Sequence, residues 1–374
     1  MFMYFQENYW WSLMVMGSLG MGGEISEIDE ICRPLRDVAG RNDDVAREAW
    51  FEGWSRMASR LERVARDRRD AGFRVSASRL FLRAANYQLL AEGMVQFGHN
   101  RKLQAYERAL ELFRQGIRLQ DHPVEFVDVP FEGTTLPAIF VPATGASSRA
   151  PCLVHFDGSD DVKEITYLRH GLGFANRGIA TLIVDHPGSG GSLRLRNLRA
   201  RPDIETAASA AVDFLEQRPD VDPDRVGIIA QSLGGYYAPR AAAFEPRFKL
   251  CVVWGAIWDW YRVREGQGST FEPKDFQVFR SSDRDEVIGL VRQFTLEGGI
   301  AERVRCPVLI VHGENDRQCP LWTAETTYDR MTGSPRRELK VFRLDEGGAS
   351  HCGADVKSMV TDYIHDWVAR FFDL

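Results

Sequence analysis

Ser232 lies in the segment VGIIAQSLGGYYAPR, where an apolar run is followed by small residues and then by a helix-forming stretch. A strand, a tight turn and a helix in this order place a serine hydroxyl on the exposed tip of the turn, with the helix amino terminus behind it. The turn requires small residues two positions before and after the serine. Ala230 and Gly234 meet this requirement, although the Gly-x-Ser-x-Gly pattern has glycine first. The segment predicts a nucleophilic Ser232, and the alternative is a serine that only caps a helix.

A serine hydroxyl needs a base to take its proton, and the base needs a third group that fixes its tautomer. Hydrolases with this strand-turn-helix signature carry serine, acid and histidine in that chain order. VLIVHGENDRQCP places Asp316 after one apolar run, and FRLDEGGASHCG places His351 after the next. We predict that both act with Ser232. The alternatives are a turn carboxylate at Asp316, with Asp345 or Glu346 as substitute acid, and a structural role for His351.

Acyl transfer also requires hydrogen-bond donors for the developing oxyanion. The backbone N–H of Leu233, which follows the serine, is the first candidate. The loop in HFDGSDDVKE supplies the second, because Gly158 and Ser159 let the backbone approach closely. The alternative is an ordinary strand-to-helix turn. His312 lies where an apolar run meets its turn and is interpreted as structural.

The elements that must position these residues are short apolar runs separated by helix-length segments. The runs are VEFVDVPF, TTLPAIFV, CLVHF, ATLIV, VGIIA, KLCVVWG, PVLIVHG and LKVF. Strands that are apolar on both faces predict an α/β fold with a mostly parallel, doubly wound sheet covered by helices on both sides. Chemistry in such sheets occurs beyond the carboxyl ends of the strands. The long connection before PVLIVHG predicts an insertion at about residues 260–302.

The first third of the chain has a different pattern. From about residue 25 to residue 120, apolar residues recur at spacings of three and four, and strand signals are absent. We therefore expect a helical domain at 1–120 and a second domain at 121–374. The first 23 residues are rich in apolar and aromatic residues, but they lack a basic start and contain Glu7 and Asn8, and their apolar part is shorter than the roughly 20 residues that a membrane span needs. We interpret them as an arm that packs on the protein.

The composition of the chain indicates which kinds of molecule it binds. The net charge is −6, with 44% hydrophobic and 27% charged residues, and there is no basic excess of the kind that nucleic-acid binding shows. We expect a small-molecule partner, with no nucleic acid and no membrane. The six cysteines show neither a C-x-x-C pair nor the spacing of a zinc site, so we expect no metal and reduced thiols in the cytoplasm.

These motifs together resemble the alpha/beta-hydrolase superfamily. The chain is most similar to the 2,6-dihydroxypseudooxynicotine hydrolase group, to which FrsA-type proteins and fungal polyketide-shortening hydrolases are related. The resemblance covers nearly the whole chain, through SASRLFLRAANYQLLAEG, DGSDDVKE, DHPGSGGS, AQSLGGYYAPRAAAFEPR, HGENDRQCP and SHCG. One departure is Asp157 and Gly158, where the family's oxyanion loop usually has paired glycines.

The resemblance implies an alpha/beta-hydrolase fold with an N-terminal helical cap domain, an active site between the two parts and a homodimer. It implies a Ser232, Asp316 and His351 triad that needs no cofactor and cleaves a carbon–carbon bond next to a ketone. An extra glutamate near the cap assists one relative, and Glu265 is the weakly matching candidate here.

The same triad hydrolyses esters and thioesters, and it transfers acyl groups or closes rings when water is excluded. A binding module without catalysis is the third hypothesis. The aromatic residues of the N-terminal region, among them Trp10 and Trp11, suit a flat aromatic or polyketide-like substrate, although most are expected to be helix core.

Overall fold

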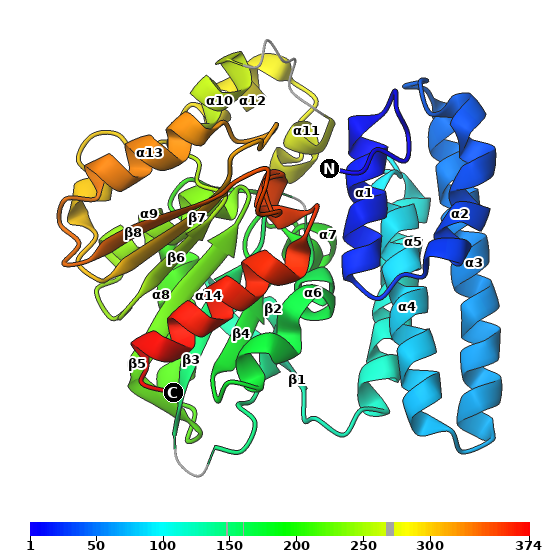
Figure 1. Cartoon of the computed structure of the whole chain (residues 1–374), viewed down its shortest axis with the longest axis horizontal. Coiled ribbons are helices and arrows are strands. Elements are labelled where there is room, and N and C mark those ends of the chain that lie inside the picture. Colours follow the sequence, from blue (N-terminus) through cyan, green and yellow to red (C-terminus); the bar gives the residue numbers. More distant parts are fainter. Residues whose placement is uncertain (147–148, 160, 267–272) are drawn as a thin grey trace. The chain divides into compact units, whose positions relative to one another are not determined.

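The computed structural model describes residues 1–146, 149–159, 161–266 and 273–374, which divide into two units, Met1–Pro123 and Val124–Leu374 (Figure 1). The first unit is helical. Its elements are α1 (Tyr9–Gly20), α2 (Ile25–Cys32), the 3-10 helix η1 (Arg33–Val38), α3 (Asp44–Asp70), α4 (Arg74–Gly93) and α5 (Asn100–Arg118).

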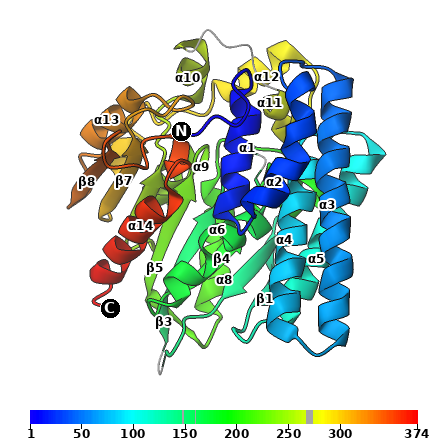
Figure 2. The ribbon, with the colours of Figure 1, turned by 45° about the vertical axis from the view of Figure 1, so that its right-hand side comes forward.

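Local signals explain where these helices begin. Asp43 accepts a hydrogen bond from the Ala46 N–H at 3.0 Å and so caps α3, the longest helix. Helices α3, α4 and α5 lie side by side in Figure 2. The apolar start of the chain contains helix α1, and the Asn86 amide of α4 donates to the Ser18 carbonyl of α1 at 3.1 Å. The N-terminal segment is therefore part of the core of its own unit.

The second unit is built on an eight-stranded sheet in the order β1-β2-β4-β3-β5-β6-β7-β8. From β4 across to β8 the neighbouring strands are parallel, whereas β2 pairs antiparallel with β1 and with β4. The predicted α/β class is confirmed. The strands are β1 (Glu125–Phe131), β2 (Thr134–Val141), β3 (Ala150–Phe156), β4 (Ala180–Val184), β5 (Val221–Gln231), β6 (Cys251–Trp254), β7 (Val308–Gly313) and β8 (Arg337–Phe342).

Helices cover both faces of this sheet, and each face has its own apolar core. Alternate residues of a strand serve the two cores: Val154 of β3 belongs to the core with α8 and α9, and Leu153 to the core with α6 and α14. Figure 1 shows α6 and α14 on the near face. The helices are α6 (Lys163–Ala175), α7 (Gly190–Arg196), α8 (Glu205–Glu216), α9 (Gly234–Phe244), α13 (Leu321–Arg330), η3 (His351–Gly353) and α14 (Lys357–Phe371).

The long connection between β6 and β7 carries α10 (Trp260–Gly266), α11 (Pro273–Phe279), α12 (Arg284–Val291) and η2 (Ala301–Arg303). Residues 267–272 of the predicted insertion lie outside the described residues. The buried ion pair of Arg264 with Asp275, at 2.9 Å, joins α10 to α11. Among the described helices of the whole chain, none is long and apolar enough to cross a membrane.

Candidate active site

Ser232 occupies the turn between β5 and α9. Its backbone has φ of 58°, in the left-handed region that non-glycine residues seldom adopt. A hydrogen bond of 2.8 Å from the Ser232 N–H to the Trp254 carbonyl of β6 holds the turn. Such strain persists where the surrounding structure over-determines it, and it lifts the side chain out of the strand at the carboxyl edge of the sheet.

The small residues around the serine explain why Ala230 is accepted. A Cβ on Gly234 would lie 2.6 Å from the Cβ of Ala230, so these two positions face each other and only one of them has room for a methyl group. Gly235 is equally constrained, because its Cβ would meet the Gly255 carbonyl oxygen at 2.1 Å. The departure from Gly-x-Ser-x-Gly therefore leaves the geometry of the turn intact.

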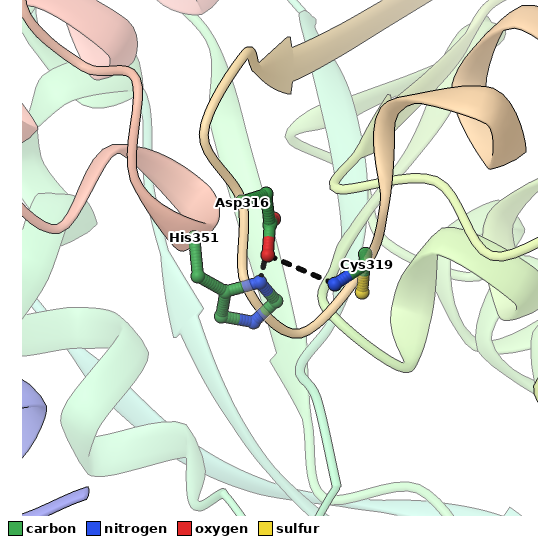
Figure 3. Close-up of side chains that lie close together, drawn as sticks. All are labelled: Asp316, Cys319 and His351. Atoms are coloured by element: carbon green, nitrogen blue, oxygen red, sulfur yellow. Dashed lines mark hydrogen bonds and ion pairs between the residues drawn. The ribbon is translucent and has the colours of Figure 1, made fainter. Parts of the chain in front are cut away.

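His351 joins Ser232 to Asp316. The Oγ of Ser232 lies 2.9 Å from Nε2 of His351, and Nδ1 of the same ring lies 2.7 Å from Oδ2 of Asp316. Figure 3 shows the imidazole against the carboxylate. Asp316 follows β7 and His351 follows β8, two neighbouring parallel strands, so the carboxyl ends of both deliver their loops to one place. These distances are those of a nucleophile, a base and the group that orients the base.

The electrostatics of this pair suit its geometry. Burial opposes a charge on Asp316, but the positive charge and hydrogen bond of His351 outweigh it and lower the pKa of the carboxyl. Burial likewise opposes a charge on His351, whereas the Asp316 carboxylate raises the pKa of the imidazole well above its ordinary value. The other carboxylate oxygen of Asp316 accepts the N–H groups of Gln318 and Cys319 at 2.8 and 2.9 Å. Asp316 is thus held in one orientation and stabilises an imidazolium.

The substitute acids lie in a different setting. Asp345 and Glu346 are exposed, and Glu346 accepts hydrogen bonds from Lys340 Nζ at 2.7 Å and from the Arg343 N–H at 3.0 Å.

His312 is buried in β7 and its Nε2 lies 2.7 Å from the Cys319 carbonyl oxygen, so it supports the loop that carries Asp316.

Among the predicted oxyanion donors, Leu233 follows Ser232 in the chain and Gly158 lies close to it. Leu233 is the N-cap of α9, and the N–H of such a residue has no acceptor within the helix. A Cβ on Gly158 would lie 2.9 Å from the Cβ of Ser232, so glycine permits the close approach of this loop. However, the Gly158 N–H donates to the Asp157 side chain at 2.8 Å. The neighbouring Ser159 hydroxyl is buried and has no hydrogen-bond partner among the described residues. The oxyanion roles of Leu233, Gly158 and Ser159 stay predictions.

Asp157 organises this loop, a role that sequence reasoning missed. Its buried carboxylate accepts hydrogen bonds from the Gly158 N–H, from the Gln231 amide at 2.5 Å and from the Thr166 hydroxyl, and Arg169 lies 3.7 Å away. Gln231 immediately precedes the nucleophile. The carboxylate therefore ties the β3 loop to the Ser232 turn.

Two thiols near the histidine were also missed. Cys352, with φ of 48°, places Sγ 3.7 Å from Nε2 of His351 and 3.7 Å from the Trp254 carbonyl oxygen. Cys319 lies close to Asp316 on the same loop, which follows β7 (Figure 3). The motifs QCP and SHCG contained this signal, but only the register of β7 and β8 brings the two loops together.

The three candidate substrate contacts belong to α10 and α1. Glu265 is exposed in α10 and accepts a long hydrogen bond of 3.5 Å from the Tyr261 hydroxyl. Trp10 is half-buried in α1, where its ring meets Tyr9 edge to face. Trp11 is buried, with its ring centroid 4.7 Å from that of Trp50, and belongs to the core of the first unit. Their substrate roles stay predictions.

A strained serine after β5, an acid after β7 and a histidine after β8, on a mostly parallel sheet, define the class of an alpha/beta hydrolase. Comparison with known families agrees. Residues 168–373 match the prolyl oligopeptidase family, and residues 44–262 match the family described as esterase FrsA-like. Each match spans more than half of the chain, which therefore belongs to the alpha/beta-hydrolase superfamily as an FrsA-like hydrolase.

Individual relatives are similar over most of their length. The chain is 30% identical over 345 residues to "Hydrolase ORFZ" of Pyricularia oryzae, with 79% of each chain covered. It is 26% identical over 336 residues to "2,6-dihydropseudooxynicotine hydrolase" of Paenarthrobacter nicotinovorans, with 88% of each covered. The crystal structure of the 2,6-dihydroxy-pseudo-oxynicotine hydrolase has the same fold, with a TM-score of 0.76 at 23% identity over 95% and 94% of the two chains.

Proposed function

We propose that this hydrolase cleaves a carbon–carbon bond next to a ketone in a small aromatic or polyketide-like molecule, through Ser232, His351 and Asp316. The observation that carries the catalytic part is the unbroken chain from Ser232 Oγ to His351 Nε2 and from His351 Nδ1 to Asp316. The ketone part rests on the similarity to the 2,6-dihydropseudooxynicotine hydrolase over 88% of both chains.

The proposed reaction begins when Ser232 Oγ attacks the ketone carbon and His351 Nε2 takes the hydroxyl proton. The N–H of Leu233 and a donor of Ser159 stabilise the oxyanion. As the tetrahedral intermediate collapses, the carbon–carbon bond breaks, and the imidazolium returns its proton to the departing carbon. Water, activated by His351, then releases the acyl group from Ser232.

The leaving group limits the substrates. An unstabilised carbanion is too costly to expel, so the departing carbon must be part of an enolate or of an electron-rich ring that carries hydroxyl groups. The imidazolium is well placed to protonate it, because Asp316 raises the pKa of His351 and keeps the proton on the ring until the bond breaks.

Ester or thioester hydrolysis is the second candidate, and the match of residues 44–262 to the esterase FrsA-like family favours it. In acyl transfer or ring closure, the same acyl-enzyme forms, but a nucleophile other than water attacks it and releases the acyl group from Ser232. We also propose that the helical residues 1–120 form the cap that selects the substrate. We further propose that the enzyme is a homodimer, and light scattering of the purified chain tests this oligomeric state directly.

Two experiments test the proposal in sequence. A serine-directed fluorophosphonate should label the wild-type chain but not Ser232→Ala, and absence of wild-type labelling under conditions that label a reference serine hydrolase would refute the nucleophile. Turnover of acylphloroglucinol-type ketones is then compared with turnover of aryl esters. Ester hydrolysis without any ketone cleavage across a varied panel would overturn the carbon–carbon assignment and leave the triad standing.

A further inference from the structure

Three metal-ligating side chains meet at the histidine of the active site. Asp316, Cys319 and His351 are all buried, and each offers a ligand atom that lies within 4.8 Å of the other two (Figure 3). Among the described residues, this is the one group of three His, Cys, Asp or Glu side chains whose ligand atoms lie this close together. The Cys319 thiol has no part in the proposed acyl transfer, so its place in the cluster is unexplained by catalysis.

We propose that Asp316, Cys319 and His351 form a binding site for a thiophilic divalent cation such as Zn²⁺, and that occupation of this site inhibits the hydrolase. The donor set consists of one carboxylate oxygen, one thiolate sulfur and one imidazole nitrogen. Zn²⁺ takes these donors in tetrahedral sites, whereas Mg²⁺ and Ca²⁺ prefer oxygen ligands alone.

The geometry requires small side-chain movements. Zinc bonds of about 2.0–2.3 Å place tetrahedral ligand atoms roughly 3.2–3.6 Å apart. Oδ2 of Asp316 and Nδ1 of His351 are now 2.7 Å apart in a hydrogen bond, while the widest separation in the cluster is below 4.8 Å. The Asp316–His351 hydrogen bond must therefore open to admit the cation. Because catalysis needs that bond, metal binding and catalysis exclude each other, and this inhibitory consequence rests on the proposed function.

Metal binding must also displace protons. The cation binds Cys319 as a thiolate, so coordination of the thiol releases one proton. A protonated His351 must lose a proton as well, whereas in a neutral imidazole the N–H that faces Asp316 from Nδ1 must move to Nε2 when Nδ1 binds the cation.

Several neighbouring groups bias this equilibrium. The Asp316 carboxylate attracts the cation, and an imidazolium at His351 repels it. Beyond the three ligands, Cys352 of η3 lies near both Cys319 and His351, and His312 of β7 faces Asp316, with Glu325 of α13 near it.

The test uses the full chain after treatment with a chelator and a reductant. Cd²⁺ and Co²⁺ are titrated in the absence of substrate, and the thiolate-to-metal charge-transfer absorption is recorded. We expect one ion per chain, displacement by Zn²⁺ and loss of the band in Cys319→Ser and Cys319→Ala, with folding verified by thermal unfolding. Cys352→Ser is the matched control, because it removes the other thiol beside His351 and should keep the band.

Inhibition is measured on each variant relative to its own activity without metal. Zn²⁺ should inhibit the wild type reversibly, and Cys319→Ser should raise the half-inhibitory concentration by about 100-fold or more, since loss of even a partner of a ligand costs about 10- to 100-fold in affinity. An active wild type without the absorption band, or a band that survives both Cys319 variants, would overturn the inference. A chain that binds metal but hydrolyses nothing would count against the proposed function alone.

Discussion

Asp316→Asn is the substitution that most directly tests the proposed triad. The carboxylate lies 2.7 Å from Nδ1 of His351, where it stabilises the imidazolium that forms when Ser232 attacks. At this separation, Coulomb's law with an effective dielectric of about 20 gives about 6 kcal/mol. Removal of that charge corresponds to a fall in kcat of about 10⁴-fold.

The asparagine also supports the wrong tautomer. Oδ1 of Asp316 accepts two backbone N–H groups, from Gln318 and Cys319, so the amide oxygen of an asparagine is required on that side. Its NH₂ group then faces His351 and donates to Nδ1. The ring must carry its proton on Nε2, where it can no longer accept the proton of Ser232. The loss in rate therefore belongs to kcat rather than to substrate affinity.

The assay is the pH dependence of kcat and kcat/KM, with fluorophosphonate labelling rates as a second readout. Because Asp316 raises the pKa of His351 although burial lowers it, the wild-type acid limb should lie above about pH 6.5, and the limb of Asp316→Asn should move to lower pH. Asp345→Asn is the matched control and should behave like the wild type. A fall of less than about tenfold in Asp316→Asn, or a large loss in Asp345→Asn, would refute this assignment of the acid.

Other substitutions test the supporting structure. Asp157→Asn weakens the ties between the β3 loop and the Ser232 turn, so kcat should fall by up to about 100-fold with little change in KM, and an unchanged kcat would contradict the role of this carboxylate. Gly234→Ala should lower the free energy of unfolding by about 1–3 kcal/mol in denaturant, because its Cβ would lie 2.6 Å from that of Ala230. Adding Ala230→Gly should restore part of this loss, and strictly additive changes in stability of the two substitutions would refute the contact. His155 is buried, and burial lowers its pKa to about 3, so its contribution to stability is present above about pH 6.5 and is lost as the pH falls toward 3. The melting temperature of His155→Leu should therefore depend less on pH over this range than that of the wild type. Melting temperatures of the two proteins that change in parallel with pH would contradict this role of His155.

The sheet was predictable because its strands are buried on both faces. CLVHF, ATLIV and VGIIA each read as continuous apolar runs, and they form β3, β4 and β5 in the structure. Helix α1 was harder to predict, because its sequence, YWWSLMVMGSLG, is apolar all round and lacks the alternation of faces that marks a surface helix.

The surroundings of the candidate site depend on long-range register that the sequence does not display. Asp157 makes hydrogen bonds to Gln231, which lies 74 residues later, and to Thr166 on another element. Cys319 approaches His351 only because β7 and β8 are parallel neighbours with Gly313 opposite Phe342. Motif spacing along the chain identifies the strand ends, but the contacts between two loops follow from how far each extends beyond its strand.

The presence of Cys352 beside His351 raises the question of which group is the nucleophile. Nε2 of His351 lies 2.9 Å from the Ser232 hydroxyl and 3.7 Å from the Cys352 sulfur. Only the serine is at the tip of the turn that precedes a helix, next to the N–H of Leu233, whereas the Cys352 sulfur is directed at the Trp254 carbonyl oxygen, an acceptor that would repel a thiolate. Inactivation by a thiol reagent would therefore report blockage of His351 rather than a cysteine nucleophile. Labelling by the fluorophosphonate in Cys352→Ser, together with its loss in Ser232→Ala, separates the two.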